Sequence, residues 1–324
     1  ILVRVNRAIG DAARGKDDVS CAQAMPKDLG EWGASAEFVL GPFACGKDLR
    51  DISAVDYVRS AERNADAFCR QGYGGLLAAL AANVPVALAT PATRLQWGGR
   101  DVSVDTAKGA LKARAAIVTV STDVLIADKI QFAPALPKRA LDAAAKLRLG
   151  SYDHIAFELP GNPFDLRRDD VIIEKADNAR TAALLANING SSLCTVEVAG
   201  SFGRDLSARG EKEMEAFARE WLSKLFGNDA PQAIRKVSAT RWDANPYALG
   251  AFSAASVGGQ GARKILTEPM GNLFYAGEAA HETLWGTVGG AWESGARAAD
   301  AALRRIAALH EEEAPARKTK KRQR

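Results

Sequence analysis

Residues 272–297 read NLFYAGEAAHETLWGTVGGAWESGAR, and this stretch says more about the fold than any other part of the chain. The apolar run before Gly277 predicts a short strand, and Gly277 with Glu278 predicts a turn at its end. A helix should follow, with glycines at 286, 289 and 290 in or near its first turn. Glycines let backbone N–H groups approach a flat ligand closely, and a helix start carries partial positive charge. The stretch therefore predicts an anion-stabilising helix start.

The composition is that of an ordinary globular protein, because 47% of the 324 residues are hydrophobic and one large core or two moderate cores can form. The four cysteines and three histidines lie too far apart for a metal site. The last eight residues contain six Lys or Arg and account for all of the net charge of +4. No apolar run reaches the roughly 18 residues that span a bilayer. We expect a cytoplasmic protein without nucleic-acid or membrane partners.

Hydrophobic periodicity predicts mixed helices and strands. Helical turns dominate up to residue 83, and short β-like runs follow, the first three as a meander and the fourth as a buried central strand. A second, antiparallel sheet is expected between two helices, and a strand and a long helix close the chain. The strands are expected at 86–90, 93–97, 101–106, 115–122, 154–160, 171–177, 181–188, 195–200 and 272–276, and the helices at 138–147, 211–225 and from the 280s to about 309.

The glycine-rich dinucleotide-binding motif, G-x-G-x-x-G between a strand and a helix, is absent from this sequence. The segment from Gly72 lacks the third glycine and follows a helix. The segment from Gly259 lacks the third glycine and a preceding buried strand. Both segments are interpreted as turns.

Several segments nevertheless resemble a cofactor-binding family. LFYAGEAAH and GTVGGAWESGARAA closely resemble the C-terminal flavin segment of the flavin-containing amine oxidases, the family of monoamine oxidases, polyamine oxidases and flavin-dependent histone-lysine demethylases. GYGGLLAALA, LATPATRLQW, AAIVTVSTDVLIADKIQFAPALP and TRWDANPYALGAFS resemble it in the same order, so the likeness covers roughly residues 70–305. It implies a mixed α/β (α+β) fold, the C-terminal part of a two-domain FAD-dependent amine oxidase.

In that fold an FAD-binding domain is interleaved with a substrate domain built on an antiparallel sheet plus helices. The implied division assigns 1–83 to the helical part of the substrate domain, 84–150 to FAD-domain strands and a connecting helix, 151–235 to the substrate-binding domain, 236–309 to the FAD-domain return with the flavin-facing helix, and 310–324 to a disordered basic tail.

The resemblance also implies cofactor contacts. Glu278, after Gly277, matches the acid that hydrogen-bonds the ribityl or pyrophosphate part of FAD. Thr287 and Val288 match positions whose backbone meets the flavin ring. Trp242 matches the tryptophan that packs near that ring.

Two alanines refine this expectation. Ala92 matches the position whose backbone contacts adenine. Ala251 stands where monoamine oxidases carry the cysteine that bonds the flavin, so we expect non-covalent FAD.

Three residues are expected near the substrate. Thr287 occupies the site of an aromatic residue that walls the amine in monoamine oxidases. Trp285 is expected to supply an apolar or cation–π surface instead, or else to pack in the core. Lys129 resembles the lysine that holds a water against flavin N5, although a strand-edge lysine can also be merely solvated.

The implied reaction is hydride transfer from the carbon beside a neutral amine to flavin N5, hydrolysis of the imine, and reoxidation by O2 to hydrogen peroxide. This scheme requires no acid–base residue. An L-amino-acid oxidase is an alternative, which would need an arginine such as Arg94 or Arg241 to hold a carboxylate. A non-catalytic subunit that retains the fold is a second alternative.

The missing glycine-rich unit has three explanations: a truncated chain or gene fragment, a proteolytically processed subunit, or a separately encoded partner. An exposed half-site would leave large apolar surfaces in water. We therefore expect a hetero-oligomer or processed enzyme, in which a second polypeptide supplies the glycine-rich FAD-binding segment.

Overall fold

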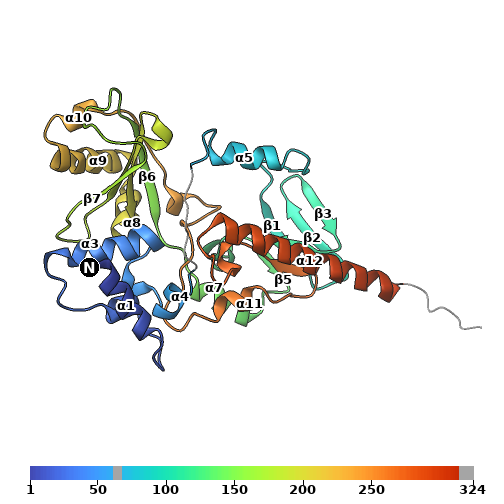
Figure 1. The fold of residues 1–324 in the computed structure, drawn as a ribbon. Coiled ribbons are helices and arrows are strands. Elements are labelled where there is room, and N and C mark those ends of the chain that lie inside the picture. The colour runs from blue at the N-terminus through green and yellow to red at the C-terminus, as the bar shows by residue number, and fades with distance from the viewer. Residues whose placement is uncertain (61–67, 314–324) are drawn as a thin grey trace, which may run out of the picture.

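In the computed structural model, which describes residues 1–60 and 68–313, the strands form three sheets. Figure 1 shows two lobes, one around β6 and β7 and one around β1, β2 and β3, with α12 running along the second lobe. The strands are β1 (Ala92–Gln96), β2 (Val102–Thr106), β3 (Gly109–Ala113), β4 (Ala116–Val118), β5 (Gln131–Ala133), β6 (Tyr152–Glu158), β7 (Asp170–Ile173), β8 (Ala183–Ala186), β9 (Leu193–Ala199), β10 (Arg235–Ala239) and β11 (Leu273–Tyr275).

The expected antiparallel sheet is confirmed, and its order is β10-β6-β9-β8-β7. Residues of β6 alternate between buried and half-buried, so one face packs into the core and the other is open to contacts. The core face meets α8 (Gly200–Arg209), α9 (Glu211–Phe226) and α10 (Ala230–Ala233). The apolar face predicted for α9 is buried there, with Met214, Phe217, Ala218, Trp221 and Leu222.

The meander is confirmed with its strands shifted, because β1, β2 and β3 pair antiparallel and β5 adds to β1 in parallel. The strand expected at 86–90 is wrong. That segment lies between Pro85 and Pro91 and contains Ala89 at φ 48°, a backbone conformation that a strand does not accommodate. The third strand is β3 instead, which hydrophobic periodicity could not reveal because all five of its residues are exposed.

The strand expected at 115–122 shrinks to β4, which is only partly buried and pairs in parallel with β11. The chain leaves the strand early because the Ser121 hydroxyl accepts a hydrogen bond from the amide of Val124 and caps α6 (Thr122–Ile126). The remaining helices beside these strands are α7 (Lys138–Lys146), α11 (Ala262–Leu266) and the short η6 (Glu278–Ala280).

The first 60 residues are helical, as expected, and pack around a core of their own that also contains Trp285. Their elements are α1 (Leu2–Ala12), α2 (Cys21–Ala24), η1 (Gly30–Trp32), α3 (Gly33–Phe38), η2 (Val39–Phe43), η3 (Leu49–Asp51) and α4 (Ala54–Arg59). The break expected at 71–75 ends sooner, since α5 (Tyr73–Leu80) begins within it. Two further short 3-10 helices are η4 (Ile188–Gly190) and η5 (Trp242–Ala244).

The closing helix is α12 (Val288–Glu313), which packs against β11 through Phe274, Ala276, Ala298 and Ala302. It extends beyond the expected end at 309, so residues 310–313 belong to the helix and the rest of the predicted tail lies outside the described residues. Among the described residues, no helix combines the length and the hydrophobicity needed to cross a membrane.

Candidate functional site

The start of α12 is built by Thr287. Its hydroxyl accepts a hydrogen bond from the amide of Gly290 at 2.8 Å and donates to the carbonyl of Leu284 at 2.6 Å. The Thr287 carbonyl in turn accepts from the amide of Ala291 at 3.1 Å. Thr287 is therefore the residue that caps this helix.

Two backbone N–H groups at the start of α12 remain available to a ligand. Within the part of the chain that the structure describes, the amides of Val288 and Gly289 donate to no protein acceptor. Both residues are exposed, Val288 to 51%. Unpaired amides at the positive end of a 26-residue helix form a surface suited to an acceptor-rich or anionic group.

The glycines at 286, 289 and 290 have different surroundings. A Cβ on Gly290 would lie 2.1 Å from the Leu284 carbonyl oxygen, and one on Gly286, which has φ +67°, would lie 3.0 Å from the Phe252 ring. Both positions need glycine because the chain packs against itself there. A Cβ on Gly289 would meet only the Thr287 hydroxyl at 3.8 Å. Gly289 alone leaves space on the exposed face.

Gly277 and Glu278 join the end of β11 to this helix start. Gly277 has φ +149°, and its amide donates to the Ser294 hydroxyl of α12 at 2.9 Å. The Glu278 carboxylate accepts from the Ser253 amide at 2.9 Å, the Ser253 hydroxyl at 2.8 Å and the Gly286 amide at 2.7 Å. Burial raises the pKa of Glu278, whereas Arg263 and these three hydrogen bonds lower it. In this structure Glu278 clamps the turn to the helix start.

A buried ion pair lies beneath the clamp. Arg263 donates two hydrogen bonds to Asp56, at 2.9 and 2.7 Å, and both side chains are 1% exposed. Arg263 also donates to the Ser253 hydroxyl at 3.0 Å and to the Ala279 carbonyl at 3.2 Å. Because the Ser253 hydroxyl also donates to Glu278, the ion pair of Arg263 and Asp56 holds the Glu278 hydrogen bonds in place.

Trp285 packs next to this buried ion pair. It is 2% exposed, packs with the N-terminal helices, and lies 4.9 Å from the Arg263 guanidinium, measured to the ring centroid. The expected cation–π contact thus exists, but its cation is Arg263 and the surroundings are core. A substrate-facing surface at Trp285 is not what this structure shows.

Aromatic side chains from distant segments adjoin the helix start. The Phe252 ring, which touches Gly286, lies 6.1 Å from the Tyr152 ring, and Tyr152 lies 5.4 Å from the His154 ring. Phe43 lies 6.3 Å from Tyr152 on another side. We call Phe43, Tyr152, His154 and Phe252 the aromatic wall. Sequence reasoning missed it, because its members come from three separate segments; the only signal was His154 in a predicted strand.

Trp242, the expected ring-packing tryptophan, is joined through its backbone to β6, the strand that carries Tyr152 and His154. It begins η5, and its side chain is 42% exposed. Its amide donates to Asp153 at 3.0 Å, and the neighbouring Thr240 hydroxyl donates to the same carboxylate oxygen at 2.9 Å. Because Asp153 precedes His154 in β6, Trp242 and His154 are anchored to one strand.

Other expected residues lie elsewhere. Ala92 is half-buried at the start of β1, opposite Thr106. Lys129 is exposed between α6 and β5, and it forms no ion pair or hydrogen bond with any other described residue. Of the arginines considered for an amino-acid substrate, Arg94 is exposed on β1, and Arg241 donates to the Ser207 carbonyl at 3.0 Å.

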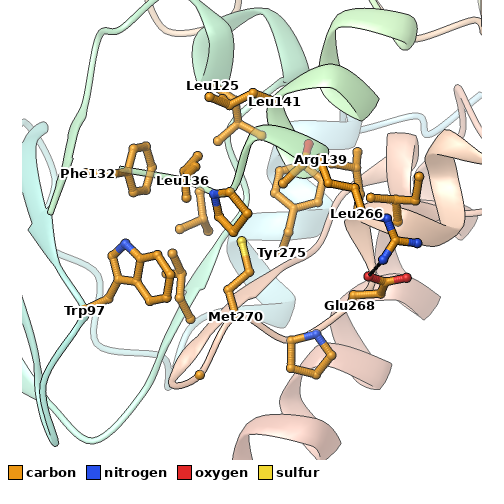
Figure 2. A pocket seen from close by; sticks show the side chains of 17 residues that line it. Trp97, Leu125, Phe132, Leu136, Arg139, Leu141, Leu266, Glu268, Met270 and Tyr275 are labelled. Carbon is orange, nitrogen blue, oxygen red and sulfur yellow. Dashed lines mark hydrogen bonds and ion pairs between the residues drawn. The ribbon is translucent and has the colours of Figure 1, made fainter. Parts of the chain in front are cut away.

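An apolar cavity of about 280 Å³ lies on the opposite side of β11 from α12. Figure 2 shows Trp97, Phe132, Leu136, Met270 and Tyr275 around it, with the ion pair of Arg139 and Glu268 at one side. None of the residues predicted to bind cofactor or substrate lines this cavity. The candidate site is therefore the exposed start of α12 together with Trp242 and the aromatic wall.

Comparison with known proteins shows which family the chain is similar to. Residues 22–303 match the family model of flavin-containing amine oxidoreductases. The chain is 30% identical over 243 residues to polyamine oxidase 4 of Oryza sativa subsp. japonica, covering 72% of this chain and 48% of that one. It is 27% identical over 272 residues to human (Homo sapiens) lysine-specific histone demethylase 2, covering 79% of this chain and 33% of that one. It thus spans a third to about half of these relatives.

Two solved structures have the same fold. Cyclohexylamine oxidase from Brevibacterium oxydans IH-35A superposes with a TM-score of 0.67 at 18% identity, covering 97% of this chain and 74% of that one. A double mutant of putrescine oxidase with redesigned cofactor binding superposes with a TM-score of 0.73 at 17% identity, covering 94% and 74%. These likenesses confirm the expected mixed fold of helices and sheets.

Proposed function

Since this chain belongs to the family of flavin-containing amine oxidoreductases, we propose that it carries the flavin-facing and substrate-facing parts of an enzyme that oxidises an amine to an imine, with O2 reduced to hydrogen peroxide. The imine then hydrolyses to an aldehyde or ketone and ammonia. The family supports FAD as the cofactor. The observation that carries the proposal is the exposed start of α12, with two unpaired amides beside the clamped turn at Gly277 and Glu278.

The chemistry that bound FAD would supply is acceptance of a hydride from the carbon beside the amine nitrogen, with transfer of the electrons to O2. The residues at the start of α12 fit the flavin ring of FAD. The amides of Val288 and Gly289 would donate to it, and the space at Gly289 would admit its face. A helix start facing the ring would favour negative charge there by about 0.5–2 kcal/mol.

The other residues would hold this surface in place. Thr287 sets the direction of the two amides, and Glu278 fixes Gly286 and the turn behind it. Trp242 and the aromatic wall would exclude water and cover the substrate, so that the reacting C–H bond is oriented at the ring. In this proposal Gly277, Glu278 and Trp285 are positioning residues and Ala92 contacts the adenine. The exposed Lys129 would hold a water against the flavin.

We propose non-covalent FAD, because Ala251 offers no thiol where a cysteine would bond the ring. Ala251 lies in the segment beside Phe252, and its amide donates to the Gly150 carbonyl at 3.0 Å. Acid precipitation of the flavin-loaded protein is expected to leave the flavin in the supernatant. Flavin that stays with the precipitated polypeptide contradicts this expectation.

We also propose that a further polypeptide segment completes the flavin site, supplied by a second chain or by another part of the same protein. Apolar side chains of α5 and α12 support this, because they are exposed: Leu76 to 42%, Leu80 to 61%, Trp292 to 66% and Leu303 to 64%. Apolar surface of this extent commonly marks an interaction site. The native mass of the flavin-loaded protein tests the proposal, and a flavin-replete monomer of this chain alone contradicts it.

The activity is tested by mixing the flavin-loaded protein with benzylamine, a diamine and an amino acid without oxygen. We expect an amine to bleach the visible flavin absorption, and peroxide to form when air is admitted. A stably bound flavin that no amine bleaches would contradict catalysis and favour a non-catalytic subunit. Bleaching by the amino acid alone would favour the amino-acid oxidase.

A further inference from the structure

His154 and Glu197 form a paired imidazole and carboxylate on the face of the antiparallel sheet that carries the aromatic wall. The two residues are cross-strand partners in β6 and β9, and His154 Nδ1 lies 2.5 Å from Glu197 Oε2. Glu197 is 3% exposed, and its other oxygen accepts a hydrogen bond from the Thr195 hydroxyl. With Nδ1 held by Glu197, the proton-exchanging nitrogen left to a ligand is Nε2.

His154 is accessible as well as oriented. The imidazole is 44% exposed, and Nε2 bonds no other group in the described part of the chain. It belongs to the aromatic wall, in which Tyr152 and Phe252 connect it to Gly286 at the helix start. An amine that binds against this wall would be able to contact the exposed imidazole.

The charged groups around His154 favour proton uptake. Burial lowers the pKa of the imidazole. The hydrogen bond and the charge of Glu197, together with the charge of Asp153, have a larger effect in the opposite direction, so the pKa is raised overall. The carboxylate of Asp153 accepts from Thr240 and from the Trp242 amide. Burial and Glu197 raise the pKa of Tyr152, so its hydroxyl stays neutral.

The hydride-transfer scheme itself needs no acid–base residue because it starts from the neutral amine, but a substrate that arrives as an ammonium must first lose a proton. An alkyl ammonium group has a pKa of about 10.4, as in lysine, so only about four amines in ten thousand are neutral at pH 7. The reacting form is the neutral amine, whose nitrogen lone pair assists loss of hydride from the neighbouring carbon. A site that receives the ammonium must therefore accept one proton per turnover.

We propose that His154 is a catalytic residue of this site, whose Nε2 takes the proton from the bound substrate ammonium, and that Glu197 is its positioning residue. This inference rests on the proposed function. In the step an N–H bond of the ammonium breaks, an Nε2–H bond forms, and the amine keeps the electron pair. The imidazolium is held by Glu197 through Nδ1–H and later returns the proton to solvent. The step changes no oxidation state.

The kinetic test compares His154→Gln with the matched control His310→Gln, whose histidine is exposed near the end of α12. With benzylamine, H154Q is expected to slow flavin reduction at pH 7 by roughly 100-fold or more, the usual size of a general-base effect. The deficit should shrink as pH approaches 10, because solvent then supplies neutral amine. H310Q should match the unmodified protein. A deficit that is absent, or equal at every pH, overturns the proposal.

A second test does not depend on turnover. The chain has three histidines, so H154Q identifies the His154 signal in a histidine NMR spectrum of the flavin-loaded protein. Tert-butylamine has no C–H bond beside its nitrogen and cannot be oxidised. Its binding near pH 8 should shift the His154 signal toward the protonated form, and Glu197→Gln should lower the pKa of His154. A signal that ignores the amine overturns the proposal, even if the protein oxidises amines. An amine that shifts the signal while no amine bleaches the flavin contradicts the proposed function alone.

Discussion

The two halves of the candidate site differ in how the sequence encodes them. The helix start is local: Gly277, Glu278, Thr287 and Gly290 lie within fourteen consecutive residues, and the hydrogen bonds from Gly286 to Glu278 and from Gly290 to Thr287 stay there. The aromatic wall is assembled, since Phe43, Tyr152 and Phe252 are far apart in the chain and meet only in the folded protein. A local site can be predicted from a motif, whereas an assembled one requires the tertiary structure.

Replacing Arg263 tests whether the local half depends on a distant residue. Arg263→Met leaves the buried Asp56 side chain without its partner, which should lower the free energy of unfolding by about 3–5 kcal/mol. The control Arg139→Met removes an exposed ion pair with Glu268 and should cost about 0–1 kcal/mol. Urea unfolding measures both variants. Equal costs would show that the buried pair does not hold the site.

Replacing Gly290 and Gly289 separately distinguishes packing within the protein from space for a ligand at the helix start. Gly290→Ala should lower the free energy of unfolding by about 1–3 kcal/mol, because the new methyl group would lie 2.1 Å from the Leu284 carbonyl oxygen. Gly289→Ala should keep or slightly increase stability, since alanine favours a helix and the position is open. The same G289A protein should bind FAD more weakly in a titration, because its methyl group projects where the ring is proposed to lie. Unchanged flavin affinity in G289A would place the ring elsewhere.

The smallest effect concerns the cap of α12. Thr287→Val removes the hydroxyl that accepts from Gly290 and donates to Leu284, and should lower the free energy of unfolding by about 1 kcal/mol. Thr283→Val is the matched control, because Thr283 is exposed and its hydroxyl forms no hydrogen bond with another described residue. Chemical denaturation resolves a difference of this size. A neutral T287V would mean that Leu284 and Gly286 orient the helix start without the cap.

These differences explain what the sequence could and could not predict. The strand, turn and helix of 272–297 were predictable because hydrophobic period, glycine and helix-start residues agree over a short range. The antiparallel sheet was predictable for the same reason, since β6 and β9 alternate or run apolar between turns. The exposed β3 was not, because it has no buried face and therefore no period.

Residue roles were harder to predict than elements. The motif leaves Trp285 either at the substrate or in the core. The structure places it in the core against Arg263, a contact that no pattern in the motif encodes. His154 was passed over because a single histidine in a strand has no signature. Its carboxylate partner Glu197 is supplied by the register of β6 with β9, which only the folded sheet defines.

The pairing of Asp56 with Arg263 also has a consequence for the order of assembly. The two residues are separated by 207 positions, and the loop they close contains both lobes. Contacts of such separation form late, because the entropy of closing the loop is lost before the contact is gained. During synthesis, the contacts of Arg263 with Asp56 and Ser253 therefore cannot form until Arg263 has left the ribosome, and cofactor loading that depends on them must come after that point.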